Sequence, residues 1–149
     1  MPKLDLSKLP VQNRTGYLEP YRAEVAGRSW RELSAAGGLT DFGANLVVLE
    51  PGAWSSQRHW HTAEDELVVV LSGELTLVTD AARAESMLPG DCATFKKGVA
   101  NGHHLQNRTN APATFLAVGR DAPEQDACEY PDIDQYWSKA TGYVRPSER

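Results

Sequence analysis

Short β-prone runs separated by Gly and Pro turn signals constrain the fold of this chain more than any other sequence feature. Turn signals such as Pro51-Gly52, Ser72-Gly73 and Pro89-Gly90 end the runs at short intervals, and Gly there can supply the positive φ of a tight turn. The stretches expected to be extended are 45–49, 57–62, 66–71, 74–79, 92–95, 103–107 and 114–119. Many short strands with little helix predict an all-β sandwich or barrel.

The flanking segments show no sustained hydrophobic period. A chain of 149 residues is expected to form one domain over residues 1–149. We expect a barrel core over about residues 45–119, an N-terminal arm over 1–44 and a C-terminal segment over 120–149.

Three local predictions concern these flanks and one loop. Residues 29–33 are expected to form a short helical turn, stopped by Gly37-Gly38, and 80–85 a second turn of the barrel. A short helix is expected around 134–139. The C-terminal segment carries several aromatic residues, so it is expected to pack on the barrel or on a second subunit. Those residues are Tyr130, Tyr136, Trp137 and Tyr143.

Charge and composition exclude several classes of partner. The formal net charge is −5, whereas nucleic-acid binding draws most of its affinity from a basic face. The sequence has no apolar stretch of the length needed to cross a membrane, and its first residues lack the apolar core of a secretory signal. Two cysteines, Cys92 and Cys128, are typical of a reducing compartment. We therefore expect a cytoplasmic protein that binds neither nucleic acid nor membrane.

The four histidines lie in two short segments. His59 and His61 flank Trp60, so in a strand both imidazoles would lie on one face, with Glu66 opening the next strand. Alone, a His-x-His pair is more often two ordinary histidines than a metal site. However, His103 and His104 are the other two histidines of the chain, and such clustering is hard to explain by packing. The pattern indicates a metal site in which either His103 or His104 takes part.

The two segments resemble the motifs of the cupin superfamily, in particular small single-domain bacterial cupins. The first motif corresponds to Gly52, His59, His61, Glu66 and Gly73, and the second to Gly90, Lys96, Gly98, His103 and Asn107. Lys96 replaces a proline of the family pattern, and Val99 to Gly102 lengthens the loop before the histidine.

The resemblance implies a double-stranded β-helix, or jelly-roll barrel, that holds one divalent transition metal. His59, His61, Glu66 and His103 would be the ligands. Three imidazoles and a carboxylate suit iron, manganese, nickel or zinc. The implied function is a metal-dependent enzyme of dioxygenase, isomerase or lyase type acting on a small anionic molecule. The alternative is a non-enzymatic module that binds or senses a small ligand. No acid-base residue is identified, and a homodimer is expected by analogy.

Three further residues are candidates for the substrate pocket. Gln57 shares the strand parity of His59, so it could face the cavity, although a wall residue without a chemical role is the commoner case. Cys92 could also face the cavity, although a buried thiol with a structural role only is the commoner case. His104 is expected to pack beside the metal ligands if it is not itself a ligand.

Overall fold

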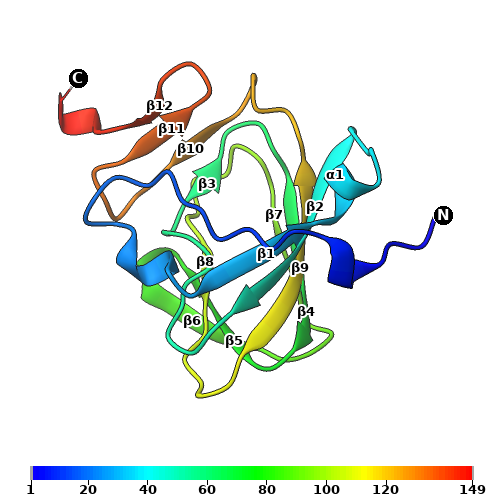
Figure 1. Ribbon diagram of the computed structural model, residues 1–149. Coiled ribbons are helices and arrows are strands. Elements are labelled where there is room, and N and C mark those ends of the chain that lie inside the picture. The colour runs from blue at the N-terminus through cyan, green and yellow to red at the C-terminus, as the bar shows by residue number, and fades with distance from the viewer. Residues whose placement is uncertain (1, 149) are drawn as a thin grey trace.

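The computed structural model describes residues 2–148, and antiparallel strands dominate them (Figure 1). The strands are β1 (Arg28–Glu32), β2 (Phe42–Leu49), β3 (Trp60–His61), β4 (Glu66–Ser72), β5 (Leu75–Thr79), β6 (Arg83–Met87), β7 (Cys92–Phe95), β8 (His104–Gln106), β9 (Ala113–Arg120), β10 (Ala127–Glu129), β11 (Tyr136–Ser138) and β12 (Gly142–Val144). Helical structure consists of α1 (Leu33–Ala36) and short 3-10 turns at Leu6–Lys8, Ala23–Val25, Asp80–Ala82 and Pro146–Glu148.

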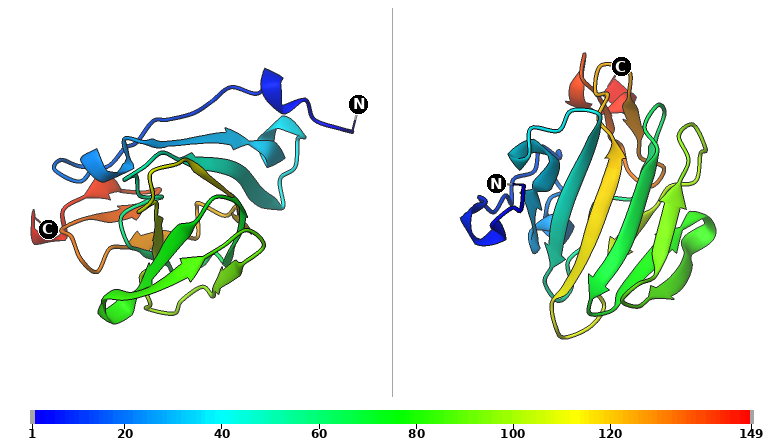
Figure 2. Two further views of the ribbon diagram at one scale, coloured as in Figure 1. Left: turned by 90° about the horizontal axis from the view of Figure 1, so that it is seen from below. Right: turned by 90° about the vertical axis from the view of Figure 1, so that its right-hand side faces the viewer.

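Two sheets form the body of the barrel. A five-stranded sheet has the order β1-β2-β9-β4-β7, and a three-stranded sheet has the order β6-β5-β8. β4 leads into β5 through a turn at which Gly73 has φ 75°. A Cβ atom at Gly73 would come within 2.7 Å of the Ala113 side chain, so this turn requires glycine. Figure 2 shows β2, β9, β4 and β7 side by side in the larger sheet. The predicted all-β jelly-roll fold is confirmed.

The main hydrophobic core lies between these two sheets. Leu49 and Val70 of the larger sheet and Leu75 of the smaller sheet are fully buried. In each strand the neighbour of the buried residue is less buried, which is the pattern of a strand with one face on the core. Truncating one such leucine to alanine costs roughly 2–5 kcal/mol. This core therefore fixes the frame on which the cavity walls are built.

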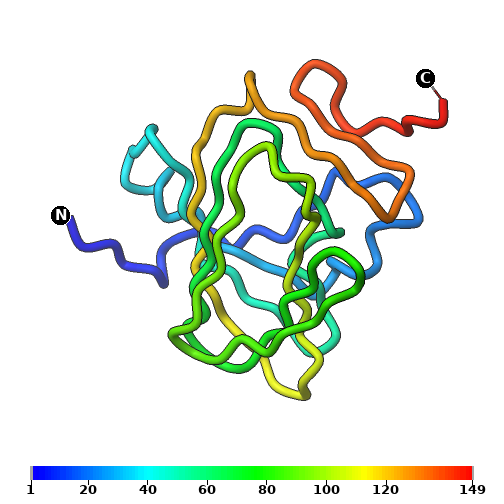
Figure 3. The backbone as a smooth tube through the Cα atoms, turned by 180° about the vertical axis from the view of Figure 1, so that it is seen from behind, coloured from blue at the N-terminus to red at the C-terminus, as the bar shows by residue number. Residues whose placement is uncertain are grey.

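A second core joins the two ends of the chain. The sheet of order β12-β11-β10-β3 lies beside the N-terminal segment. Tyr17 and Val25 from that segment are buried against Cys128 and Tyr130. The Tyr17 and Tyr130 rings meet edge to face with centroids 5.8 Å apart. The aromatic C-terminal segment thus packs within its own chain, as the tube in Figure 3 shows for its path beside residues 15–25.

The prediction of a helical turn at 29–33 is wrong, because residues 28–32 form strand β1. β1 pairs with β2 in antiparallel register, with Trp30 opposite Val47 and Glu32 opposite Asn45. Local propensity favoured a turn, but pairing with β2 satisfies the backbone of this segment and half-buries Trp30. The helix begins only at Leu33. The N-terminal segment therefore supplies a strand of the large sheet.

Two other local predictions are also wrong. The turn expected at 80–85 is confined to Asp80–Ala82, and Arg83 begins β6, which pairs along the whole of β5. The helix expected around 134–139 is instead strand β11, which forms a hairpin with β12. In both places non-local strand pairing overrides the local sequence signal.

Candidate metal centre and cavity

Strand pairing brings the two motif segments together. His59, immediately before β3, and His103, immediately before β8, form an isolated antiparallel bridge in which each backbone N–H donates to the other's carbonyl. His61 ends β3, and Glu66 begins β4. The four residues predicted as ligands therefore lie on neighbouring backbone segments, although 44 positions separate the first and last in sequence (103 − 59).

The ligand atoms of His59, His61 and Glu66 lie within 4.8 Å of one another, and His103 approaches Glu66. Nε2 of His59 lies 3.2 Å from Nε2 of His61, and Nε2 of His103 lies 3.2 Å from Oε1 of Glu66. Oε2 of Glu66 lies 3.6 Å from Nε2 of His61. Two ligand atoms held at right angles about 2.1 Å from one ion would be about 3 Å apart. The spacing and the chemistry of the donor set both fit a divalent transition metal.

The other ring nitrogen of each imidazole faces an acceptor. Nδ1 of His59 lies 2.9 Å from the Gln57 carbonyl, and Nδ1 of His61 lies 2.7 Å from a carboxylate oxygen of Asp126. Nδ1 of His103 lies 3.4 Å from the Asn101 carbonyl. An acceptor at Nδ1 holds the proton on that nitrogen and leaves Nε2 with a lone pair. All three rings are therefore oriented as metal-binding histidines are.

Electrostatics at the cluster favour a cation at its centre. Burial, together with the adjacent rings of His103 and His61, lowers the pKa of His59 to about 3, so this ring is neutral at pH 7. At Glu66, burial opposes ionisation, but hydrogen bonds from His103 and His61 hold the pKa of the carboxyl well below its usual range. Burial lowers the pKa of His61, yet its contacts with Cys128 and Glu66 raise it to about 12. The carboxylate thus stabilises positive charge here, which a divalent cation would supply.

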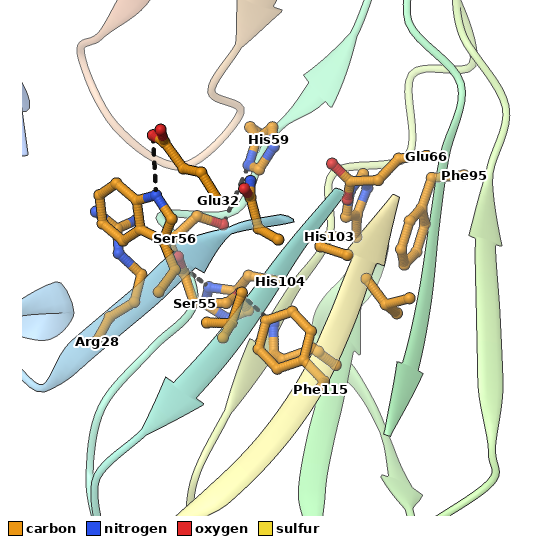
Figure 4. Close-up of a pocket in the computed structure, with 16 residues that line it drawn as sticks. Arg28, Glu32, Ser55, Ser56, His59, Glu66, Phe95, His103, His104 and Phe115 are labelled. Atoms are coloured by element: carbon orange, nitrogen blue, oxygen red, sulfur yellow. Dashed lines mark hydrogen bonds and ion pairs between the residues drawn. The ribbon is translucent and has the colours of Figure 1, made fainter. Parts of the chain in front are cut away.

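A cavity of about 400 Å³ opens beside the cluster (Figure 4). His59, Glu66 and His103 line one side, where Phe95 stacks on the His103 ring with centroids 3.5 Å apart. The opposite side is lined from β1 (Figure 4), and the floor is apolar. The β1 residues of the wall are Arg28, Trp30 and Glu32, and the apolar floor contains Val47, Val68, Leu105 and Phe115. Polar groups combined with an apolar floor are typical of a small-molecule site.

The structure separates the roles of His103 and His104. His104 lines the cavity, but its Nδ1 lies 2.8 Å from the Ser56 carbonyl and its Nε2 accepts a hydrogen bond from the Gln106 amide. Both of its ring nitrogens therefore have protein partners. Of the two, only His103 has a nitrogen directed at Glu66.

Two of the three predicted pocket residues do not line this cavity. Residues 55–58 are a bend and not a strand, so the parity that pointed Gln57 into the cavity does not hold. The Gln57 amide instead donates to the Tyr21 carbonyl. Cys92 is neither buried nor in the cavity. It is exposed because Ala93 and Phe95 take the inward positions of β7.

Sequence reasoning missed two residues that support the cluster. Asp126 is 4% exposed and also accepts a hydrogen bond from the Ala63 backbone, so its carboxylate is fixed against His61. No motif marks this part of the chain. Arg58 contacts Asp132, Asp80 and the carbonyl of Gly102, and thereby ties the β3 segment to the loop before His103. A Cβ atom at Gly102 would lie 3.1 Å from the Arg58 guanidinium, so glycine permits this approach.

Sequence reasoning also missed the β1 wall, although a signal was present. Arg28, Trp30 and Glu32 alternate with Ser29 and Arg31 at the two-residue period of a strand.

No helix among residues 2–148 is long and apolar enough to span a membrane. The expected homodimer and cytoplasmic location stay predictions.

Comparisons with known proteins place this fold in a family. The profile of the cupin domain matches residues 45–119. A sugar phosphate isomerase of the cupin superfamily from Silicibacter pomeroyi has 45% sequence identity and a TM-score of 0.90, and the match covers 98% of this chain and 94% of that chain. A protein from Acidithiobacillus ferrooxidans, proposed to be a sugar phosphate isomerase, has 29% identity and a TM-score of 0.73, with 83% and 81% covered.

A more distant structure shares only the fold. The polyketide cyclase of Streptomyces resistomycificus has 20% identity and a TM-score of 0.65, and the match covers 93% of this chain and 85% of that chain. No curated protein matches the sequence significantly. The matched domain spans both histidine segments. The fold of the Silicibacter pomeroyi protein agrees with this structure over nearly the whole chain. The chain is therefore a member of the cupin superfamily.

Proposed function

We propose that the protein is a metal-dependent isomerase that interconverts the aldose and ketose forms of a sugar phosphate. The observation that carries the proposal is the convergence of His59, His61 and Glu66, with His103 beside Glu66, at one side of a cavity whose opposite wall holds a further carboxylate, Glu32. The 45% identity to a cupin sugar phosphate isomerase over 98% of the chain supports the choice of substrate class.

In this proposal His59, His61, Glu66 and His103 hold the metal. When bound, a divalent ion would act as a Lewis acid that polarises a substrate carbonyl. The protein's part is to keep the three imidazoles fixed: Asp126 and the carbonyls of Gln57 and Asn101 hold each Nδ1, so that each Nε2 is turned towards the metal position. Phe95 covers one face of His103 and limits the approach of water to that ring.

Isomerisation moves one proton between adjacent carbons of the sugar and a second between their oxygens, so it needs no oxidant or reductant. A protein group must take the carbon-bound proton and return it to the neighbouring carbon. Glu66 is committed to His61 and His103. His104 has partners on both ring nitrogens, and burial lowers its pKa.

Glu32 remains as the carboxylate that lines the cavity outside the cluster. Its Oε1 accepts hydrogen bonds from Trp30 at 3.5 Å and Arg14 at 3.3 Å, and its side chain is 38% exposed. A partly accessible carboxylate of this kind can act as a general base. We therefore assign the proton transfer to Glu32.

The test is exchange of the carbon-bound proton. Metal-loaded protein is incubated in D₂O with a set of pentose and hexose phosphates, and deuterium incorporation next to the carbonyl is followed by NMR together with product formation. We expect exchange and interconversion for at least one substrate. Glu32→Gln should lower kcat by about 100-fold or more while metal content stays stoichiometric. Glu85→Gln, a change at an exposed carboxylate on β6, is the matched control.

Two results would overturn the proposal. Absence of both exchange and turnover for every phosphate tested would remove the isomerase, and binding without exchange would favour the ligand-binding alternative. Full activity in Glu32→Gln would remove Glu32 as the base and leave the isomerase in place.

A further inference from the structure

β1 presents a row of three polar or aromatic side chains to the cavity. Arg28, Trp30 and Glu32 occupy alternate positions of the strand, and all three line the cavity. Among the described residues that do so, Arg28 is the only lysine or arginine. Arg28 is partly buried, and a partly buried cation is costly unless it is paired or meets an anion.

The contacts of Arg28 fix its guanidinium without neutralising it. Nη1 donates to the Ser55 carbonyl at 2.9 Å and Nη2 to the Arg14 carbonyl at 3.1 Å, so neither of these partners is a carboxylate. The guanidinium lies over Trp30, 5.0 Å from the ring centroid. Its Nε is buried and has no hydrogen-bond partner among residues 2–148. A fixed cation that has no carboxylate partner is what an anionic ligand group requires.

The sheet register separates Arg28 from the metal cluster along the cavity. Glu66 pairs with Gly119, and the neighbouring row runs through Val68, Ala117, Asn45 and Glu32. Arg28 lies four residues from Glu32 on the same strand, which is roughly 13 Å of strand length. Figure 4 shows Arg28 on one side of the cavity and Glu66, His103 and Phe95 on the other. A ligand with an anion at one end and a carbonyl at the other could contact both sites.

We propose that Arg28 is the anchor for the phosphate group of the substrate, with Trp30 positioning its guanidinium. The inference rests on the proposed function for the identity of the anion and names the residue that would select phosphorylated over unphosphorylated sugars. The main competing cation is Lys96, which is exposed and lines a separate cavity beside His61 and His103.

Binding of inorganic phosphate tests the anchor directly. Isothermal titration calorimetry measures the phosphate Kd of the full-length protein, both metal-loaded and after chelator treatment, so that phosphate held by the metal is separated from phosphate held by the chain. We expect Arg28→Gln to weaken binding to the chelated protein at least tenfold, and Arg28→Lys to restore part of it.

Two matched variants test whether loss of any nearby positive charge would weaken phosphate binding. Arg31→Gln removes the neighbouring arginine of β1, which has the same unpartnered Nε but lies outside the cavity lining. Lys96→Gln removes the competing cation. Both should bind phosphate within twofold of the parent protein. The anchor is refuted if the parent protein binds no phosphate, if Arg28→Gln binds as tightly as the parent, or if Arg31→Gln or Lys96→Gln loses as much affinity.

Turnover separates this inference from the proposed function. If the protein isomerises a sugar phosphate and Arg28→Gln leaves kcat and KM unchanged, the anchor fails and the isomerase stands. If no substrate turns over but Arg28→Gln alone abolishes phosphate binding, the isomerase fails and the anion site stands. With both intact, Arg28→Gln should raise KM for the phosphorylated sugar and leave metal content unchanged.

Discussion

The two walls of the cavity are built in different ways. The metal wall comes from two short motifs whose ligands lie on or next to β3, β4 and β8, within the matched cupin domain. The β1 wall comes from residues 28–32, outside that match, and reaches the cavity because β1 pairs with β2. The metal wall has its rings fixed by hydrogen bonds, whereas the β1 wall holds a charged guanidinium by two carbonyls. In the function that we propose, the first wall holds the metal and the second selects the substrate.

The largest effect is expected when two side chains of the metal wall are removed. The double substitution His59→Ala, His61→Ala deletes two of the converging Nε2 donors, so metal retention should be abolished. Plasma mass spectrometry of protein purified without added metal or chelator measures the content. His104→Gln is the control and should retain metal, because the ring nitrogens of His104 bind Ser56 and Gln106 instead. Unchanged metal in the double variant would refute the assignment of the ligands.

A smaller effect is expected from Asp126, which contacts the ligand His61 and not the cluster's centre. Asp126→Asn removes the charge that holds the Nδ1 proton of His61, so metal affinity should fall by about 10–100-fold. Competition with a chelating dye measures the Kd. Cys128→Ser, a change at a more distant neighbour of the same nitrogen (3.5 Å), should alter the affinity far less. Equal losses in both variants would indicate a general disturbance of β10.

Substitution of Arg58 tests how much its ion pairs beside the metal wall contribute to stability. Its side chain is 10% exposed, but its partners Asp80 and Asp132 are 48% and 54% exposed, so solvent screens the ion pairs. Arg58→Met should lower the free energy of unfolding by about 1–2 kcal/mol, measured by urea denaturation. Arg83→Met, at an exposed pair, should change it by less than about 0.5 kcal/mol.

The loss of stability in Arg58→Met should depend on pH. The hydrogen bond from Arg58 holds the pKa of Asp132 below its usual range. The resulting stability is fully present above the unfolded-state pKa of about 3.9 and is lost as the pH falls through the lower folded-state pKa. The difference between Arg58→Met and the parent protein should therefore narrow below about pH 4. A constant difference down to the acid transition would remove Asp132 from this account.

The last prediction concerns thiol reactivity, where no effect on function is expected. Cys92 is exposed on β7, whereas Cys128 is buried beside His61 and burial raises the pKa of its thiol. Maleimide labelling followed by mass spectrometry should modify Cys92 in the native protein at least about 100-fold faster than Cys128. Comparable rates would show that the packing behind the metal wall opens readily.

The sequence signals for the candidate metal wall are local. His59, His61 and Glu66 lie within eight positions (66 − 59 + 1), and strand alternation alone orients the two histidines. The β1 wall and Asp126 depend on which strands pair across long stretches of chain, and no short window carries that information. Residues 29–33 were expected to form a helical turn for this reason, although 28–32 form β1, and Gln57 was misplaced because a bend interrupts the alternation before His59. Side-chain partners such as Asp126 emerge only with tertiary structure.

The pairing of β10 with β3 has a consequence for the order of events during synthesis. The last of the four proposed ligands, His103, leaves the ribosome 23 residues before Asp126 (126 − 103). At 5–20 residues per second this interval is roughly 1–5 s. A nascent chain therefore carries every ligand before it carries the carboxylate that orients His61. Early metal capture would be loose and exchangeable, and the ion would be retained firmly only after the C-terminal strands have added to β3.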